Sequence, residues 1–225
     1  MRQTWNKLLF AHWPIRADQI QALIPSALTL DTFDGTAWVG IVPFAMNDVS
    51  FRFLSALPSN FCELNVRTYV SYKGRGGVFF FSLDASNPLA VEVARAAFRL
   101  SYFHSRMRIT GTTDSIDYTC QRRDWRSAEV NFEASYGPTG AVQYSAKGSI
   151  EEFLTERYCF FTSGAGGRVM SCDVHHGQWP LQPAAAQFRR NTILEPLSLN
   201  LLKLEPLLHY CHKLETIEWL LESCD

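Results

Sequence analysis

The ten residues FCELNVRTYV, from Phe61 to Val70, alternate strictly between apolar and polar side chains. The apolar set is Cys62, Leu64, Val66, Thr68 and Val70, and the polar set is Glu63, Asn65, Arg67 and Tyr69. A period of two predicts a β-strand with one face in a hydrophobic core. The other face carries an acid, an amide and a base, so it faces either solvent or a cavity.

Other short apolar or alternating segments predict strands along most of the chain. They cover residues 5–13, 28–33, 36–44, 78–84, 102–110, 115–120, 130–136, 141–147, 157–162 and 168–174. Helical spacing and capping signals occur at 16–24, 88–99 and 149–156, and the final segment ETIEWLLESC (215–224) also resembles a helix. Strands dominate, which predicts a β-rich α+β fold. No Pro/Gly/Ser-rich linker divides the chain, so residues 1–225 are expected to form a single domain.

Proline and glycine predict where several strands turn or end. Asp34-Gly35 is a strong hairpin signal. Pro14 is expected to stop the first strand, because proline restricts the residue before it and lacks a backbone N–H. Pro43 predicts that the strand over 36–44 has an edge or a bulge at its far end.

Two further segments carry apolar residues for which the sequence gives an expectation about exposure or packing. Residues 47–60 predict a loop over a pocket or an extra edge strand, with Phe51, Phe53 and Leu54 exposed. The helix over 88–99 begins with Asn87 as its cap and Pro88 at its first position. Its apolar stripe is expected to consist of Leu89, Val93, Ala96 and Ala97.

The composition limits the classes of protein to which the chain can belong. Of its 225 residues, 47% are hydrophobic and 19% charged, as in an ordinary globular protein with ample core material. The net charge of −1 offers no basic footprint for nucleic acid. No membrane contact is expected, because no apolar run is long enough to span a bilayer and no signal peptide is visible. Six cysteines without a C-x-x-C pair predict free thiols and a cytoplasmic location. A homo-oligomer remains open.

Metal and nucleophile chemistry have no clear motif in this sequence. The two groups of metal-ligating side chains are Cys172, Asp173, His175 and His176, and His209, Cys211 and His212. Neither has the paired spacing of a zinc site, and adjacent histidines on a strand point to opposite faces. There is no G-x-S-x-G, and the glycines at 164–167 indicate a hairpin, since no Lys-Ser/Thr follows them. No metal and no cofactor is therefore expected.

Glu63 and Arg67 lie four residues apart on one strand, a separation of roughly 13 Å. They cannot pair along the strand, and a buried unpaired charge is very costly. If their face is enclosed, each needs a partner from another strand. The available partners are His12 and three residues that share one face of the strand over 102–110. The complete set of pocket candidates is Glu63, Asn65, Arg67, Tyr102, His104, Arg106 and His12.

Several long blocks, in a fixed order, resemble the YqjF-like family of uncharacterised bacterial proteins. They are LLFAHWPI, LDTFDGTAWVGIVPFAM, ELNVRTYV, GVFFFSLDA, FLTERY and HHGQWPLQ. This resemblance implies the fold of acetoacetate decarboxylase, a cone-shaped antiparallel β-barrel around a pocket, with a few short helices. It makes the face of Glu63, Asn65 and Arg67 the expected lining of that pocket.

The resemblance to the decarboxylase covers one pocket residue but not the reactive amine. Glu63 matches that enzyme's pocket glutamate. The positions that match its Schiff-base lysine and a second lysine are residues 100–103, Leu-Ser-Tyr-Phe, and the site of its arginine falls near Trp13-Pro14. A Schiff base needs a nucleophilic amine, so decarboxylation by that route is not expected. Lys147 is the one lysine expected in the middle of a strand, where it can be buried.

Three functions remain open on these grounds. The first is a pocket for a small, anionic organic molecule, with Glu63 as base or acceptor and Arg67 or Arg106 as the anion's partner. The second is a ligand-binding module without turnover. The third is a structural or partner-binding protein whose barrel is filled by its own side chains. The sequence does not decide whether the chain is an enzyme.

Overall fold

The structure is a computed structural model that describes residues 1–51, 54–201 and 204–224. Within these ranges, side chains are described for all residues except 51 and 54–59. The expected exposed cluster of Phe51, Phe53 and Leu54 lies outside the described side chains. No helix within the described ranges is long and apolar enough to cross a membrane.

Strands make up most of the described chain. They are β1 (Arg2–Ile15), β2 (Thr29–Leu30), β3 (Ala37–Phe51), β4 (Leu54–Tyr72), β5 (Arg75–Ala85), β6 (Tyr102–Gly111), β7 (Ile116–Arg122), β8 (Asn131–Pro138), β9 (Cys159–Ser163), β10 (Val169–His176), β11 (Gln182–Asn191), β12 (Leu207–Glu218) and β13 (Glu222–Ser223). The α-helices are α1 (Ala17–Gln21), α2 (Pro88–Phe98) and α3 (Ile150–Thr155), with short 3₁₀ turns at Ala165–Gly167 and Glu195–Leu197.

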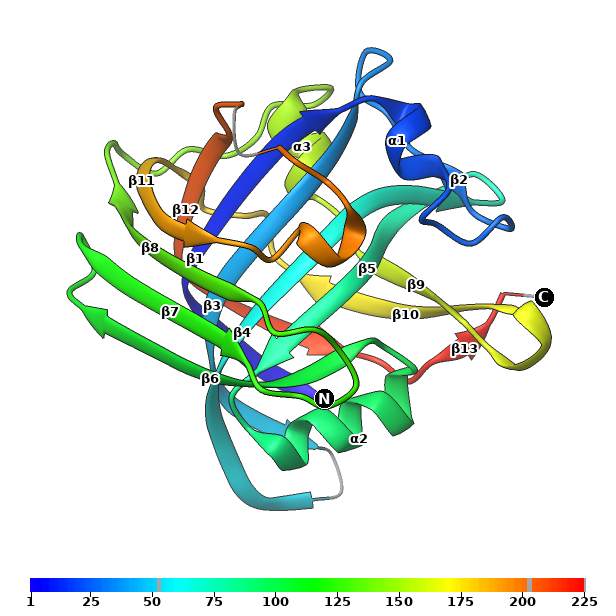
Figure 1. Cartoon of the computed structure of the whole chain (residues 1–225), viewed down its shortest axis with the longest axis horizontal. Helices are drawn as coiled ribbons and strands as arrows, with labels where there is room; N and C mark the ends of the chain where they lie inside the picture. The colour runs from blue at the N-terminus through cyan, green and yellow to red at the C-terminus, as the bar shows by residue number, and fades with distance from the viewer. Residues whose placement is uncertain (52–53, 202–203, 225) are drawn as a thin grey trace.

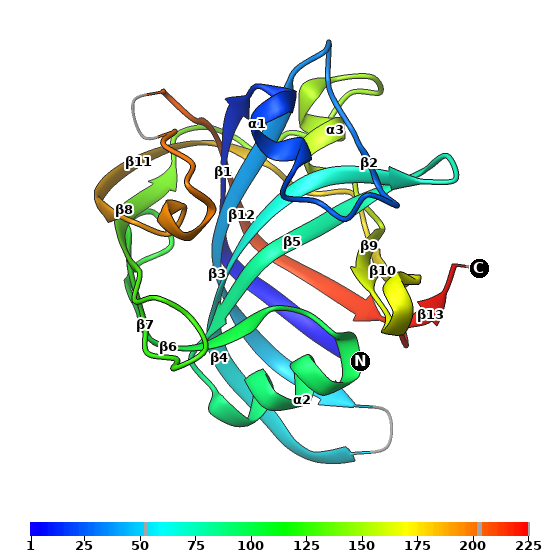
Figure 2. The same ribbon diagram turned by 45° about the vertical axis from the view of Figure 1, so that its right-hand side comes forward.

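The described strands form one sheet that closes on itself (Figures 1 and 2). Its order is β13-β10-β9-β5-β6-β7-β8-β11-β12-β1-β3-β4-β2, and the additional pairings β10–β12 and β5–β4 close a ring through β4, β5, β9, β10, β12, β1 and β3. Strands β6, β7, β8 and β11 form a second layer that links β5 to β12 beside this ring. The pairings are antiparallel except β5–β6 and β5–β9. The expected β-rich barrel with a few short helices is therefore confirmed.

The main hydrophobic core lies between the ring and the second layer. Leu64 and Val66, from the apolar face of β4, pack there with Tyr118 of β7 and Phe132 of β8. Successive side chains of a strand point to opposite faces. The polar face of β4 must therefore point into the ring.

In the structure, both of the strands with a predicted proline end continue past the proline. β1 does not stop at Pro14, which pairs with Trp38 of β3. The pairing of β1 with β12 ends at His12, so Pro14 lies where β1 has become an edge strand and needs no second ladder. Pro43 lies in an inner strand, opposite the irregular pairing between Asn6 and Ala11, which confirms the bulge rather than the edge.

Two expected elements are wrong. Residues 141–147 are not a strand, because the free side of β8 is taken by β11 and these residues keep only an isolated bridge between Gln143 and Leu181. Lys147 is consequently exposed in a turn. The C-terminal segment is not a helix but the end of β12 followed by β13, because pairing with β1 and β10 outweighs its local helical pattern.

Capping of two helices follows the sequence. The Asn87 Oδ1 accepts hydrogen bonds from the backbone N–H groups of Leu89 and Ala90, at 3.0 and 3.2 Å. The Ser149 Oγ accepts from the Glu152 N–H at 3.2 Å, as the capping-box pattern predicts. α2 lies across one end of the ring, and α3 lies at the other end (Figures 1 and 2).

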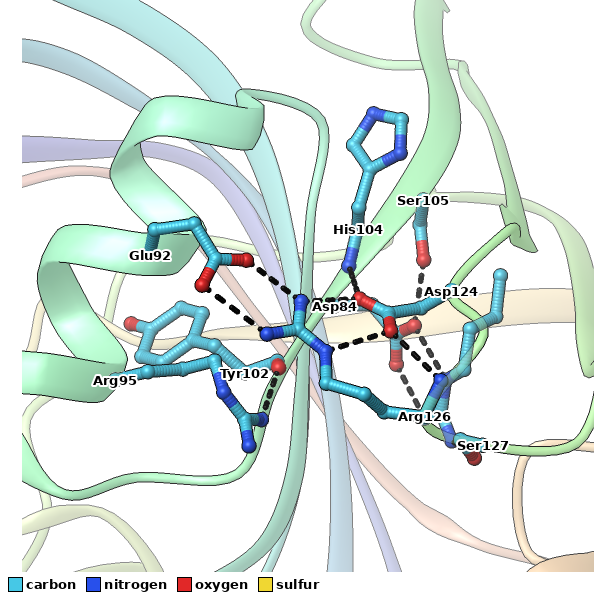
Figure 3. Close-up of polar contacts among 10 residues, drawn as sticks. Asp84, Glu92, Arg95, Tyr102, His104, Ser105, Asp124, Arg126 and Ser127 are labelled. Carbon is cyan, nitrogen blue, oxygen red and sulfur yellow. Dashed lines mark hydrogen bonds and ion pairs between the residues drawn. The ribbon is translucent and has the colours of Figure 1, made fainter.

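A buried ion pair joins the ring to the second layer. Asp84 of β5 and Arg122 of β7 are 0% and 2% exposed, and two parallel hydrogen bonds of 2.8 and 2.7 Å link them. Ser105 donates to the Asp84 carboxylate at 2.6 Å, and Arg122 donates to the Ser127 hydroxyl at 2.9 Å. Figure 3 shows Asp84, Ser105 and Ser127 gathered in this network. The arginine also lies over the ring of Phe103, with its Cζ 4.3 Å from the ring centroid.

A second network fixes α2 against the start of β6 (Figure 3). The Arg126 Nη2 donates to Glu92 of α2 and to Asp124, both at 2.7 Å. The Arg95 Nη1, also from α2, donates to the backbone carbonyl of Tyr102 at 2.7 Å. These contacts hold Tyr102 at the end of the ring that α2 covers.

Breaking the buried pair should destabilise the protein strongly. We expect Arg122→Met to lower the free energy of unfolding by roughly 3–5 kcal/mol, since it leaves the Asp84 charge buried without a cation. Arg123→Met is the matched control, because Arg123 makes an exposed ion pair with Glu129 and should cost about 1 kcal/mol or less. Urea unfolding measures both, and an equal loss in the two variants would contradict this account.

Candidate ligand-binding site

The ring encloses a cavity of about 480 Å³. Small-molecule sites typically measure about 300–1,000 Å³. The walls are mainly apolar and aromatic, from residues such as Leu8, Val42, Phe44, Phe80 and Phe160. The cavity is therefore large enough and apolar enough to hold a small organic molecule.

Glu63, Asn65 and Arg67 enter the cavity from β4. Their exposed fractions are 3%, 5% and 9%. β4 lies between β3 and β5 along this stretch, and its pairing with both strands fixes the register. The polar face of the alternating stretch is thus a cavity wall and not a solvated surface.

Glu63 is surrounded so that its neutral form is favoured. Burial raises the pKa of this carboxyl to about 8, with smaller contributions from the nearby charges of Glu218 and Asp84. The Tyr102 hydroxyl opposes the shift by donating to the Glu63 Oε2 at 2.9 Å. Glu63 therefore holds a proton through most of the neutral pH range.

Glu218 is a second carboxyl in the cavity, and the sequence analysis missed it. Burial raises its pKa to about 7, although the Gln3 Nε2 donates to its Oε1 at 2.8 Å and lowers it. The segment was interpreted as a helix, which concealed its position. The alternation of Leu214, Thr216 and Glu218 with exposed Glu215 was the available signal for a strand.

Arg67 has no acidic partner among the described residues. The Arg67 Nη2 donates to the backbone carbonyl of Leu154 at 3.3 Å, and its Cζ lies 5.1 and 5.8 Å from the ring centroids of Phe10 and Tyr69. The Nε is buried and has no hydrogen-bond partner. Among the ion pairs formed by described residues, none includes Arg67.

A glycine on β3, Gly40, leaves room for the Arg67 side chain beside His12. Gly40 is paired with His12 on one side and with Arg67 on the other. A Cβ atom at Gly40 would lie 2.9 Å from the His12 Cδ2 and 3.4 Å from the Arg67 Cγ. The close approach of the two side chains therefore requires glycine.

His12 supports this end of the cavity without lining it. The Tyr69 hydroxyl donates to the Leu154 carbonyl at 2.7 Å and lies 2.6 Å from the His12 Nε2. The single proton of the tyrosine is used on the carbonyl, so the His12 Nε2 carries the proton of their shared hydrogen bond. Burial lowers the pKa of His12 well below its usual value, and the charge of Arg67 lowers it further, so the imidazole is neutral.

His104 and Arg106 do not join the cavity, contrary to expectation. β6 pairs with β5 of the ring from Tyr102 to His104, and from Ser105 onward it pairs with β7 in the second layer. Figure 3 shows the imidazole of His104 directed away from Tyr102, and Arg106 is exposed to solvent. Alternation placed all three residues on one face correctly, but that face is part of the cavity wall only at Tyr102.

The two ends of the cavity differ in character. Leu89 and Val93 of α2 line one end and are 71% and 38% exposed, so the expected apolar stripe is wrong and the helix buries Val91 and Phe98 instead. Arg157 lines the other end, and its Nη1 lies 2.7 Å from the Asp31 Oδ2. We interpret the α2 end as the mouth of the cavity.

Two features of the cavity wall bear on amine and metal chemistry. None of the described lining residues is a lysine. The part of the chain that the structure describes contains no group of three or more His, Cys, Asp or Glu side chains arranged to hold a metal ion.

The closed arrangement of strands defines the class of protein by fold. Acetoacetate decarboxylase from Legionella pneumophila is similar over 100% of this chain and 87% of its own, with a TM-score of 0.66 and 14% identity. An acetoacetate decarboxylase-like enzyme from Sphingomonas wittichii RW1 is similar over 100% of this chain and 92% of its own, with a TM-score of 0.67 and 12% identity. The chain has the acetoacetate decarboxylase-like fold.

Sequence similarity then identifies the family. Residues 2–215 match the model of the DUF2071 family, described as an uncharacterized conserved protein. The uncharacterized protein YqjF of Bacillus subtilis (strain 168) is 42% identical over 221 residues, which cover 97% of this chain and 90% of YqjF. The chain belongs to the DUF2071 family, as the YqjF-like blocks of its sequence predicted.

The raised pKa of Glu63 predicts how stability depends on pH. A buried acid with a raised pKa stabilises the fold while it is protonated, so stability falls as pH rises from about 4.5 through about 8. We expect Glu63→Gln to remove a loss on the order of 4 kcal/mol across that window. Melting curves from about pH 5 to about pH 9 measure the difference between the two proteins.

Glu222→Gln is the control, since Glu222 is exposed on β13 and should leave the pH profile unchanged. Glu218 adds to the decline in both proteins, so only the difference between wild type and Glu63→Gln is diagnostic. Parallel profiles for those two proteins would mean that Glu63 ionises normally, against our account.

Proposed function

We propose that the cavity binds a small organic carboxylate whose anionic group pairs with Arg67. The observation that carries this proposal is the Arg67 guanidinium itself, which is 9% exposed and lacks a carboxylate partner among the described residues. A buried charge without a counterion is strongly unfavourable. Guanidinium groups bind carboxylates through two parallel hydrogen bonds. A ligand carboxylate would therefore supply the counterion that Arg67 lacks among the described residues.

The remaining walls support a ligand with an organic body. Apart from the polar side chains of β4, β6 and β12, most lining residues are aliphatic or aromatic. Burial of apolar ligand surface against them would stabilise the complex by about 25 cal/mol per Å² before the costs of association. A cavity of about 480 Å³ also speaks against the alternative of a barrel filled by its own side chains.

The same proposal excludes Schiff-base chemistry at this site. Relatives of this fold include an acetoacetate decarboxylase, but the described cavity walls carry no lysine. Lys147, the one lysine for which burial was expected, is exposed. Glu63 is then a proton donor or hydrogen-bonding group toward a non-covalently bound ligand.

Replacement of Arg67 tests the anion site. We expect Arg67→Met to weaken hexanoate binding by about tenfold or more, because a charge-assisted hydrogen bond is lost. The variant should be at least as stable as wild type without ligand, since it removes an unpaired buried charge. Ligand-induced shifts in melting temperature and calorimetric titration measure both effects.

Arg106→Met is the matched control, because Arg106 is exposed on β6 and should bind hexanoate like wild type. Hexanamide, the uncharged analogue, should bind weakly to all three proteins. Equal hexanoate affinities for wild type and Arg67→Met would rule out Arg67 as the counterion.

Absence of Schiff-base chemistry is tested by trapping. Acetoacetate and borohydride should leave the intact mass of the protein unchanged, because an ordinary exposed lysine is protonated at neutral pH and a poor nucleophile. A known acetoacetate decarboxylase treated in parallel is the positive control. A stoichiometric reduced adduct on one lysine of this chain would show the proposal to be wrong.

A further inference from the structure

We propose that the ligand is an ω-amino carboxylate, with its carboxylate on Arg67 and its ammonium group between Glu63 and Glu218. This inference rests on the proposed function and names the substrate class of the same site. It follows from the distribution of charged and hydrogen-bonding groups along the cavity.

The two carboxyls form no ion pair with the described residues. Both Glu63 and Glu218 line the cavity. Glu63 accepts a hydrogen bond from the Tyr102 hydroxyl, and Glu218 accepts one from the Gln3 amide. The N-terminal ammonium of Met1 donates to the backbone carbonyl of Glu218 at 2.6 Å, and its charge lowers the pKa of the Glu218 carboxyl without forming an ion pair with it.

Unused acceptors lie beside these carboxyls. Gln3 is 0% exposed, and its Nε2 donates to Glu218 while its Oε1 has no partner. Asn65, between Glu63 and Arg67 on the polar face of β4, likewise has an unpaired Oδ1. Unpaired buried acceptors are unfavourable, and an ammonium group offers three donors.

Aromatic rings suit a cation at this position. Trp5 and Tyr102 line the same cavity as the two carboxyls. A cation near an aromatic face is attracted by the ring quadrupole, most strongly where water is excluded. A purely apolar ligand tail would leave the amide oxygens of Gln3 and Asn65 without donors and would bring no cation to the two carboxyls.

The spacing of the groups sets the length of the ligand. Glu63 and Arg67 are separated along β4 by roughly 13 Å at the backbone, and the hydrogen bonds at the two ends of a ligand would take up part of that distance. Chains such as 4-aminobutanoate, 6-aminohexanoate and 8-aminooctanoate bracket the separation that remains. Their methylene groups would contact the apolar walls.

Ionisation of the carboxyls gives the proposal a distinctive signature. Burial raises the pKa values of Glu63 and Glu218 to about 8 and about 7. An ammonium group beside them favours their ionised forms. Binding at neutral pH should therefore release protons to the buffer, whereas binding of hexanoate should not.

The experiment compares matched ligands on the wild-type protein by calorimetry in two buffers of different ionisation enthalpy. The best ω-amino acid should bind at least about tenfold more tightly than the carboxylic acid of equal length and should release protons. Glu63→Gln and Glu218→Gln should each reduce this preference while hexanoate binding persists. Glu222→Gln, at an exposed position, is the control and should keep the preference.

The outcomes separate this inference from the proposed function. If hexanoate binds through Arg67 as tightly as every ω-amino acid, without proton release, the inference is wrong and the carboxylate site stands. If Arg67→Met leaves all binding unchanged, the proposed function fails as well. Failure of every ligand to bind wild type would contradict both.

Discussion

Arg67 is a buried cation that the protein surrounds with a carbonyl oxygen and two aromatic rings but with no acidic side chain among the described residues. Its position is fixed by its own strand. Leu64 and Val66 occupy the core on the opposite face of β4, and a slip of one residue would exchange the two faces. The core therefore holds Arg67 in the cavity, along with Glu63 and Asn65. Gly40 leaves the space that the Arg67 side chain needs beside His12.

The chain treats buried charge in two different ways. Between the ring and the second layer, Asp84 and Arg122 are paired through two hydrogen bonds, and serine hydroxyls bond to both. In the cavity, Arg67 and Glu63 share one strand face but lie too far apart to pair, and Glu63 keeps its proton instead. A fully paired network serves the fold. Unpaired groups around a hollow space are typical of a binding site.

The sequence predicted the cavity wall on β4 because alternation is a local signal and the resemblance supplied the barrel. It placed Tyr102 correctly but extended the site to His104 and Arg106, since period two cannot show where a strand leaves a ring. Glu218 and Gln3 were missed because they become neighbours only when β12 pairs with β1. The C-terminal helix prediction failed for the same reason, as pairing across the chain outweighed local propensity.

An anion at Arg67 is the central claim, and anomalous scattering from crystals soaked in bromide locates anions directly. The account predicts a bromide peak in contact with the Arg67 guanidinium, inside the ring, and none there in Arg67→Met crystals. A cavity without bromide, in which Arg67 instead contacts a carboxylate of the protein, would contradict it.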